Sequence, residues 1–219
     1  MKIGIVGAGN IGGNLTRRLT HLGHEVRVAN SRGPETLSEL AELTGARAVP
    51  ILDVAEGADL VIIAVPEKNV PALPPGFLTG AAAGVVVIDT GNYYPQQRDG
   101  RIGEIEEGLT ESGWVAQQIK HPVVKVFNGV YAANLIERAR PAGATDRMAV
   151  PVAGDDPAAK KVVMDLVDQL GFDPVDAGTI DESWRQQPGT PVYGLDADAN
   201  GVRLALAAAH HVRSVEWRA

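Results

Sequence analysis

Apolar residues follow two kinds of pattern in the first part of the chain. Residues 3–6 form a continuous apolar run with β-branched side chains, which is typical of a parallel strand buried on both faces. The next apolar positions repeat with a helical period and are Ile11, Leu15, Leu19 and Leu22. Gly23 ends the predicted helix, because glycine readily adopts the left-handed backbone with which many helices finish. The chain therefore begins with a strand that leads into a helix.

The same alternation continues along the chain. Further strands are predicted at residues 25–29, 46–49, 60–65, 85–88, 123–127, 148–153 and 172–176. Further helices are predicted at residues 34–45, around 102–109, at 155–170 and at 202–212. Such alternation implies an α/β fold with a doubly wound, Rossmann-type parallel sheet. We expect one compact unit over residues 1–219, with the Rossmann core at 1–128 and a small C-terminal α/β extension at 129–219.

Composition narrows the class of protein. The 219 residues are 45% hydrophobic and 21% charged, which suits a folded domain with a sizeable core. The formal net charge is −7, so the surface as a whole does not attract nucleic acid or anionic lipid. There is no cysteine, no apolar run long enough to span a bilayer and no recognisable signal peptide. We therefore expect a cytoplasmic protein that binds neither nucleic acid nor membranes.

A glycine-rich segment lies between the first predicted strand and the first predicted helix. Its sequence, Gly7-Ala8-Gly9-Asn10-Ile11-Gly12, fits the pattern G-x-G-x-x-G. In such a loop Gly7 permits a tight turn, Gly9 lets a pyrophosphate approach the backbone, and Gly12 lets the helix pack closely on the strand. The start of the helix adds unpaired N–H groups and a partial positive charge. The motif in this context predicts a dinucleotide site.

The end of the second predicted strand indicates which dinucleotide is bound. NAD sites usually carry Asp or Glu here, and its carboxylate accepts a hydrogen bond from the ribose 2′-OH. This chain has no acid between Val26 and Pro34, and carries Asn30-Ser31-Arg32 instead. A hydroxyl and a guanidinium suit a 2′-phosphate, to which both can donate charge-assisted hydrogen bonds. We therefore predict that the cofactor is NADP(H).

These stretches resemble the coenzyme F420-dependent NADP reductase family and, more loosely, the NADPH-binding cytosolic domain of membrane ferric reductases. Further matching stretches are Ala64-Val65-Pro66, 124–128, 151–156 and 176–178. The resemblance extends over about residues 1–180. It implies a nicotinamide near Val65, Pro66 and the Thr90-Gly91-Asn92 loop, and an acceptor of the F420 or flavin type stacked against that ring. Asn128 either contacts the nicotinamide or caps the following helix. We also expect a homodimer.

The chain departs from the family after residue 183. Residues 183–194 have no periodicity and contain one Trp, one Tyr, two Pro and two Gly. Aperiodic segments on a rigid scaffold often carry specificity, so we expect this one to cover the acceptor side of the nicotinamide. Trp184 and Tyr193 would form a flat apolar wall, and Arg185 would steer an anionic tail of the acceptor. The alternative is a tail that packs on a neighbouring subunit.

Features that other reductases need are missing. The Tyr-x-x-x-Lys pair of short-chain dehydrogenases is absent, and so is the long helical C-terminal half of the imine and hydroxyacid enzymes. Ketone or imine reduction usually needs a proton donor, whereas hydride transfer to a flavin-type ring needs mainly stacking and alignment. We therefore predict an oxidoreductase that transfers hydride between NADPH and a flavin or deazaflavin, with no assigned catalytic side chain.

Two other functions stay open at this point. The first is an NADPH-dependent reductase of a small carbonyl or imine compound, with Tyr131, His121 or Tyr193 as proton donor. The second is a redox sensor that binds NADP(H) without turnover. No metal site is expected, because His210 and His211, adjacent on a predicted helix, would point about 100° apart.

Overall fold

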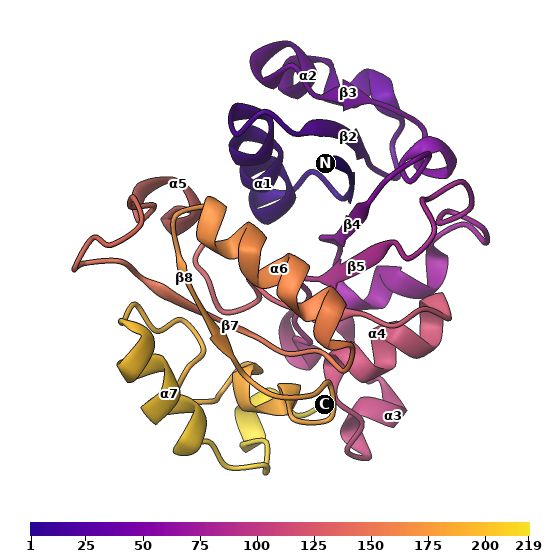
Figure 1. Cartoon of the computed structure of the whole chain (residues 1–219). Coiled ribbons are helices and arrows are strands. Elements are labelled where there is room, and N and C mark those ends of the chain that lie inside the picture. The colour runs from indigo at the N-terminus through magenta and orange to yellow at the C-terminus, as the bar shows by residue number, and fades with distance from the viewer.

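The computed structural model describes residues 1–219 and contains a six-stranded, all-parallel sheet in the order β3-β2-β1-β4-β5-β6 (Figure 1). The strands are β1 (Lys2–Val6), β2 (Glu25–Ala29), β3 (Arg47–Ala48), β4 (Leu60–Ile63), β5 (Val86–Asp89) and β6 (Val124–Lys125). This order is that of the dinucleotide-binding Rossmann fold, with its switch point between β1 and β4. The predicted fold class is confirmed.

The central strands bury side chains on both faces. Alternate residues of β1, β4 and β5 belong to two different hydrophobic cores, as the two-residue period of a strand requires. The first core contains Ile3, Ile5, Leu60, Ile62, Val86 and Ile88. The second core contains Val6, Val61, Ile63 and Val87. Both faces of the sheet are therefore covered, which explains why these strands read as continuous apolar runs.

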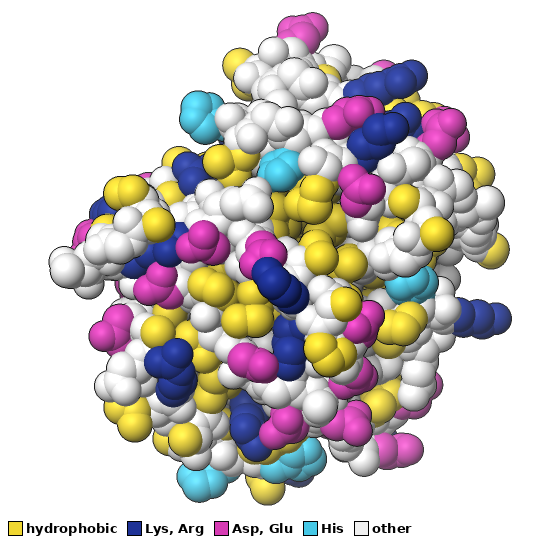
Figure 2. All heavy atoms as spheres, in the orientation of Figure 1, with side chains coloured by type: hydrophobic (Ala, Val, Ile, Leu, Met, Phe, Trp, Pro, Cys, Tyr) yellow, Lys and Arg dark blue, Asp and Glu magenta, His cyan; other side chains and the backbone are white.

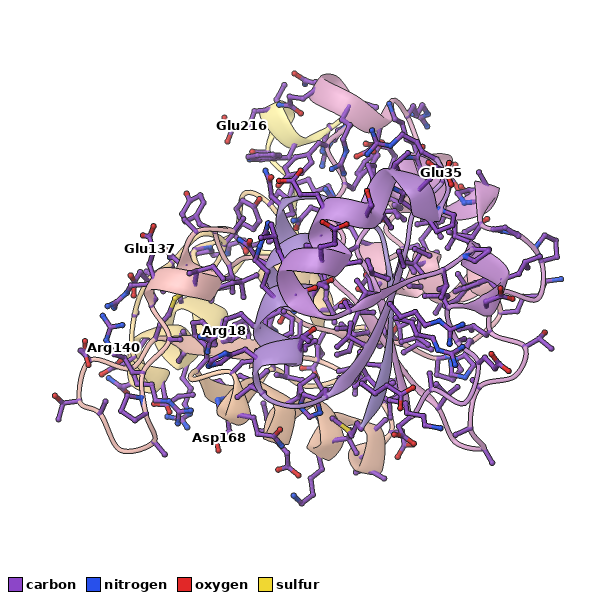
Figure 3. All side chains as sticks on the ribbon, turned by 90° about the horizontal axis from the view of Figure 1, so that it is seen from above. Arg18, Glu35, Glu137, Arg140, Asp168 and Glu216 are labelled. Atoms are coloured by element: carbon purple, nitrogen blue, oxygen red, sulfur yellow. The ribbon has the colours of Figure 1, made fainter.

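Helices supply the other half of each core. The first core receives residues of α1 (Asn10–His21) and α6 (Pro157–Gln169), and the second receives residues of α4 (Glu111–Ile119) and of the short helix η3 (Glu67–Ala72). Arg18 of α1 donates a 2.9 Å hydrogen bond to the carbonyl of Leu170, directly after α6 (Figure 3). Apart from α7 (Ala199–Ala207), the remaining helices are α2 (Ser38–Thr44), α3 (Gly103–Glu106), α5 (Asn134–Glu137), η1 (Pro34–Leu37), η2 (Ile51–Asp53), η4 (Pro95–Asp99), η5 (Ser183–Gln186) and η6 (Val215–Trp217).

The C-terminal part adds a second, smaller layer. β7 (Ala149–Val152) and β8 (Asp173–Asp176) form a two-stranded parallel sheet, and α7 (Ala199–Ala207) packs on it through a third core. Backbone hydrogen bonds of 2.8 and 3.1 Å between Lys125 and Ala153 connect the two sheets. In Figure 1, α7 lies at the opposite end of the molecule from α2 and β3. The smaller sheet therefore extends the molecule beyond β6.

The structure corrects two element predictions. α4 was not predicted, because its buried face includes the polar residues Glu111 and Ser112 and hides the helical period. The last helix ends at Ala207 rather than at residue 212, and the chain then turns so that Arg213 reaches the Glu111 carboxylate at 2.7 Å. His210 and His211 thus lie beyond the helix. Both corrections concern segments that a buried polar contact holds in place.

The surface carries charges of both signs. Figure 2 shows Lys and Arg side chains spread among Asp and Glu side chains over one face, without gathering into a basic patch. None of the helices combines the length and the apolar character needed to cross a bilayer.

Candidate active site

The loop between β1 and α1 requires glycine at two positions. Gly7 has a left-handed φ of 102°, and a Cβ there would overlap the carbonyl oxygen of Ala64 on β4. A Cβ at Gly12 would overlap the carbonyl oxygen of Gly7 itself. A Cβ at Gly9, in contrast, would meet no atom within 4 Å. The backbone thus packs tightly at Gly7 and Gly12 and leaves open space over Gly9, where a ligand can approach.

The N-terminus of α1 is free to bind an anion. Gly9 is the N-cap residue, and no side chain accepts a hydrogen bond from the first N–H groups of this 12-residue helix. The first turn carries no acidic side chain that would compete for them. Unpaired N–H groups and the helix dipole together favour a phosphate at this place.

A cavity of about 390 Å³ lies at the carboxyl ends of β1, β2 and β4. It brings together nine of the residues that the sequence predicted, namely Gly7, Ala8, Gly9, Asn30, Ser31, Arg32, Ala64, Val65 and Pro66. It is completed by five residues that were not predicted, namely Val6, Ile51, Asn69, Ala72 and Leu73. Three of these five lie within or next to η3, directly after Pro66, and the position of that helix was the only signal that could have indicated them.

The predicted 2′-phosphate end of the cavity is exposed. Ser31 and Arg32 lie on the surface turn after β2, and Arg32 also lines an adjoining cavity that includes Asn10. Asn30 fixes this turn, since its side chain accepts a hydrogen bond from the Arg32 N–H and donates one to Thr36, both at 2.9 Å. The nearest acid along the chain, Glu35, is exposed (Figure 3). Its carboxyl lies against Gly33. The turn therefore offers a hydroxyl and a guanidinium to a ligand.

The Thr90-Gly91-Asn92 loop follows β5, next to the Val65-Pro66 end of β4, but does not line the cavity itself. Asn92 and Asn128 are joined by two hydrogen bonds, of 2.8 and 3.0 Å, and Asn128 also donates to the carbonyl of Gln186 at 2.6 Å. Phe127, just before Asn128, is buried with a left-handed φ of 65°. A bulky residue is rarely found in this conformation, which here turns the chain so that Asn128 faces the loop.

A buried cluster of Lys125, Asp89 and Glu111 contacts the Thr90-Gly91-Asn92 loop. Lys125 is completely buried; its Nζ donates to the carbonyl of Gly91 at 3.1 Å and lies 3.4 Å from Glu111 and 3.8 Å from Asp89. Burial lowers the pKa of Lys125, but the Asp89 and Glu111 carboxylates outweigh that effect and raise the pKa above its ordinary value. Lys125 therefore stays charged and holds the loop through its backbone. Sequence reasoning did not single out Lys125, because its partners come from two other segments, the end of β5 with its loop and α4.

The predicted acceptor-side residues make two separate sets of contacts, one of Trp184 with Arg185 and one of Tyr193. Trp184 lines a separate cavity of about 270 Å³ and packs edge-on against His211, with ring centroids 4.8 Å apart. Arg185 pairs with Glu182 at 2.8 Å and lies over the Trp184 ring. Tyr193 instead shares a hydroxyl–hydroxyl hydrogen bond with Tyr94, which belongs to the loop after β5. Of these three residues, Tyr193 is the one that contacts the segment following Asn92.

The fold and the site together define a Rossmann-type oxidoreductase that depends on NADP. Residues 2–93 match the sequence model of the family described as NADP oxidoreductase, coenzyme F420-dependent. That match covers β1 to β5 and with them all the residues that line the 390 Å³ cavity. The chain belongs to this family.

Two solved structures extend the likeness over most of the chain. The hypothetical protein SMa0349 from Sinorhizobium meliloti is 31% identical, over 90% of this chain and 95% of that one, with a TM-score of 0.75. A protein from Arthrobacter sp. FB24, to which an F420-dependent NADP reductase function has been ascribed, is 27% identical over 84% of this chain and 87% of that one, with a TM-score of 0.67. The C-terminal layer is therefore shared as well.

A curated relative matches over a shorter stretch. The protein YjhV of Escherichia coli (strain K12) is 59% identical over 59 residues, which are 27% of this chain and 43% of YjhV. The chain thus aligns with less than half the length of this relative. The comparison shows a local likeness in sequence and carries no activity with it.

Proposed function

We propose that the protein binds NADPH and transfers hydride between it and a flavin or deazaflavin acceptor of the F420 type. The observation that carries this proposal is the single cavity that joins the glycine loop, the Ser31-Arg32 turn and the Val65-Pro66 strand end. Its uncapped helix N-terminus suits a pyrophosphate, and its acid-free turn suits a 2′-phosphate. Family membership supports the same cofactor.

In this proposal the residues of the site bind the nucleotide or orient its nicotinamide ring. The first N–H groups of α1 bind the pyrophosphate, and Ser31 and Arg32 bind the 2′-phosphate. Val65 and Pro66 give the nicotinamide an apolar wall, and the Thr90-Gly91-Asn92 loop, held by Lys125 and Asn128, fixes its edge. NADPH, when bound, supplies the hydride, so that the protein contributes mainly alignment. The acceptor takes up that hydride and a proton from solvent.

The test is the continuous oxidation of NADPH by the full-length chain with F420, with FMN and without acceptor. We expect oxidation that depends on one of these two acceptors and is much slower with NADH. If NADPH binds but neither F420 nor FMN is reduced, the proposal is wrong.

A second function is favoured by one observation, the hydroxyl pair of Tyr94 and Tyr193. Burial, together with Tyr94, raises the pKa of Tyr193, so its hydroxyl keeps its proton at neutral pH. Such a hydroxyl can donate a hydrogen bond to a carbonyl or imine that is being reduced. Tyr193→Phe separates the two functions, since a lost proton donor lowers the rate by roughly 10²- to 10⁴-fold, whereas transfer to a flavin-type ring needs no such donor.

Further properties belong to the same proposal. We propose that residues 1–128 bind the dinucleotide, that residues 129–219 form the acceptor side, and that the protein works as a cytoplasmic homodimer. Sizing chromatography with light scattering tests the dimer, and a monomeric mass at assay concentration would contradict it.

A further inference from the structure

The proposed mechanism leaves one buried acid unused. Glu67 is the first residue of η3, directly after Pro66, and its side chain is completely buried. Neither of its carboxyl oxygens has a hydrogen-bond partner. Buried polar groups are nearly always satisfied, so an unsatisfied carboxyl beside an active site needs a functional explanation.

The carboxyl of Glu67 lies against the loop after β5. A Cβ at Gly91 would be 2.5 Å from Glu67 Oε1 and 2.9 Å from Asp89 Oδ1, so that glycine alone fits here. Asp89 Oδ1 also accepts a 2.8 Å hydrogen bond from the Gly91 N–H. The carboxyl groups of Glu67 and Asp89 thus both lie against Gly91. In the proposed function Gly91 belongs to the loop next to the nicotinamide.

The surrounding charges already balance without Glu67. The acids that face it come from three elements and are Asp89 of β5, Asp99 of η4 and Glu111 of α4. Their cationic partners are Lys125 of β6, Arg98 of η4 and Arg213 of the C-terminal segment. On η3 itself, Lys68 is exposed. Three negative and three positive charges cancel, so an ionised Glu67 would be a lone buried charge. Burial, and next the Asp89 carboxylate, raise the pKa of Glu67 well above its ordinary value.

We propose that Glu67 holds a proton while NADPH is bound and releases it to solvent when NADP⁺ is bound. The proposal rests on the proposed function, which brings the nicotinamide to Pro66 and the Thr90-Gly91-Asn92 loop. The reduced ring is uncharged and suits a neutral carboxyl below the loop. The oxidised ring carries a positive charge, and a nearby cation favours the ionised carboxylate. Loss of the proton adds one negative charge to the cluster, which the positive ring offsets.

The number of protons exchanged on binding tests this inference. Calorimetry of the full-length chain in two buffers of different ionisation enthalpy gives that number for each nucleotide separately. The expected effects fall in the pH range between the pKa of Glu67 in the NADP⁺ complex and its higher pKa in the free protein. In this range we expect the binding of NADP⁺ to release up to about one proton from the protein. We also expect the affinity for NADP⁺ to rise up to about tenfold per pH unit. NADPH should show neither effect. The 2′-phosphate is common to both nucleotides, so its own titration cancels in the comparison.

Glu67→Gln is the matched variant, because the amide keeps the size of the side chain and cannot ionise. It should abolish the difference in proton release between NADP⁺ and NADPH. Glu35→Gln, which removes an exposed acid near the Ser31-Arg32 turn, should leave that difference unchanged. Equal numbers of released protons for the two nucleotides in the unmodified protein overturn the inference, and this result does not depend on the folding of the Glu67 variant. A difference in proton release that survives in Glu67→Gln overturns it as well. If neither nucleotide binds, the proposed function itself fails.

Discussion

The two ends of the site are built in different ways. The part of the site proposed to bind the phosphates consists of backbone and neighbouring residues, since the glycine loop, the first turn of α1 and the Ser31-Arg32 turn all lie within the first 32 residues. The proposed acceptor end is assembled from distant segments. There Trp217 near the C-terminus packs 5.9 Å from Tyr94 and 6.3 Å from Tyr193, measured between ring centroids.

This difference explains why the ligand of one end can be predicted from the sequence and the ligand of the other cannot. A site made of local backbone is visible as a motif, and its ligand follows from geometry and charge. A site made of tertiary contacts has no local pattern, so its ligand has to be found by experiment. Variants at the two ends should therefore behave differently, and the following four are ordered by the size of their expected effect.

Gly9→Val should cause the largest change. The added methyl groups enter the open space over the loop, and we expect NADPH binding to fall below detection while the circular dichroism spectrum stays unchanged. Gly13→Ala on the same helix is the control, because its Cβ would have ordinary contacts of 3.6 Å or more. If the Gly9→Val protein folds and binds NADPH as tightly as the unmodified protein, the dinucleotide site does not lie at this loop.

Arg213→Ala tests how firmly the C-terminal segment is held. It leaves one oxygen of the buried Glu111 carboxylate without its cation, and we expect the free energy of unfolding in urea to fall by about 3–5 kcal/mol. Lys161→Ala, which removes an exposed ion pair with Asp165, should cost less than about 1 kcal/mol. Equal losses in the two variants would mean that the buried cluster does not stabilise this end.

Arg32→Ala addresses the choice of nucleotide. A charge-assisted hydrogen bond contributes about 1.5–3 kcal/mol, so NADPH should bind roughly 10- to 150-fold more weakly, and NADH almost as before. Calorimetry with both nucleotides measures this directly. Equal losses for NADPH and NADH would refute the assignment of Arg32 to the 2′-phosphate.

The double variant Trp184→Ala and Arg185→Ala should have the smallest effect. We expect turnover with the flavin-type acceptor to fall roughly tenfold, as the loss of one stacking contact of about 1.4 kcal/mol would cause, at unchanged NADPH affinity. Unchanged turnover, or a defect seen only as a smaller assembly on a sizing column, would mean that residues 183–194 have a structural role instead.

Sequence reasoning recovered the Rossmann sheet, and nine of the residues that it predicted for the dinucleotide line one cavity, because Gly7, Gly12 and the apolar strands have local causes. It missed α4, whose buried face includes the polar residue Glu111, and it missed Lys125, whose contacts come from two other segments, the end of β5 with its loop and α4. It extended the last helix too far, since the contact that turns the chain away, between Arg213 and Glu111, spans 102 positions. Tertiary polar contacts of this kind leave no periodic signal.

Hydride transfer is the central claim, and isotope labelling tests it most directly. NADPH that carries deuterium at the transferable position of the nicotinamide is incubated with the protein and F420, and the reduced product is examined by mass spectrometry. A deazaflavin accepts hydride at carbon, where the label does not exchange with water. We predict one deuterium in the reduced acceptor and none when the Gly9→Val protein replaces the unmodified chain. A reduced acceptor without deuterium would contradict direct transfer from NADPH.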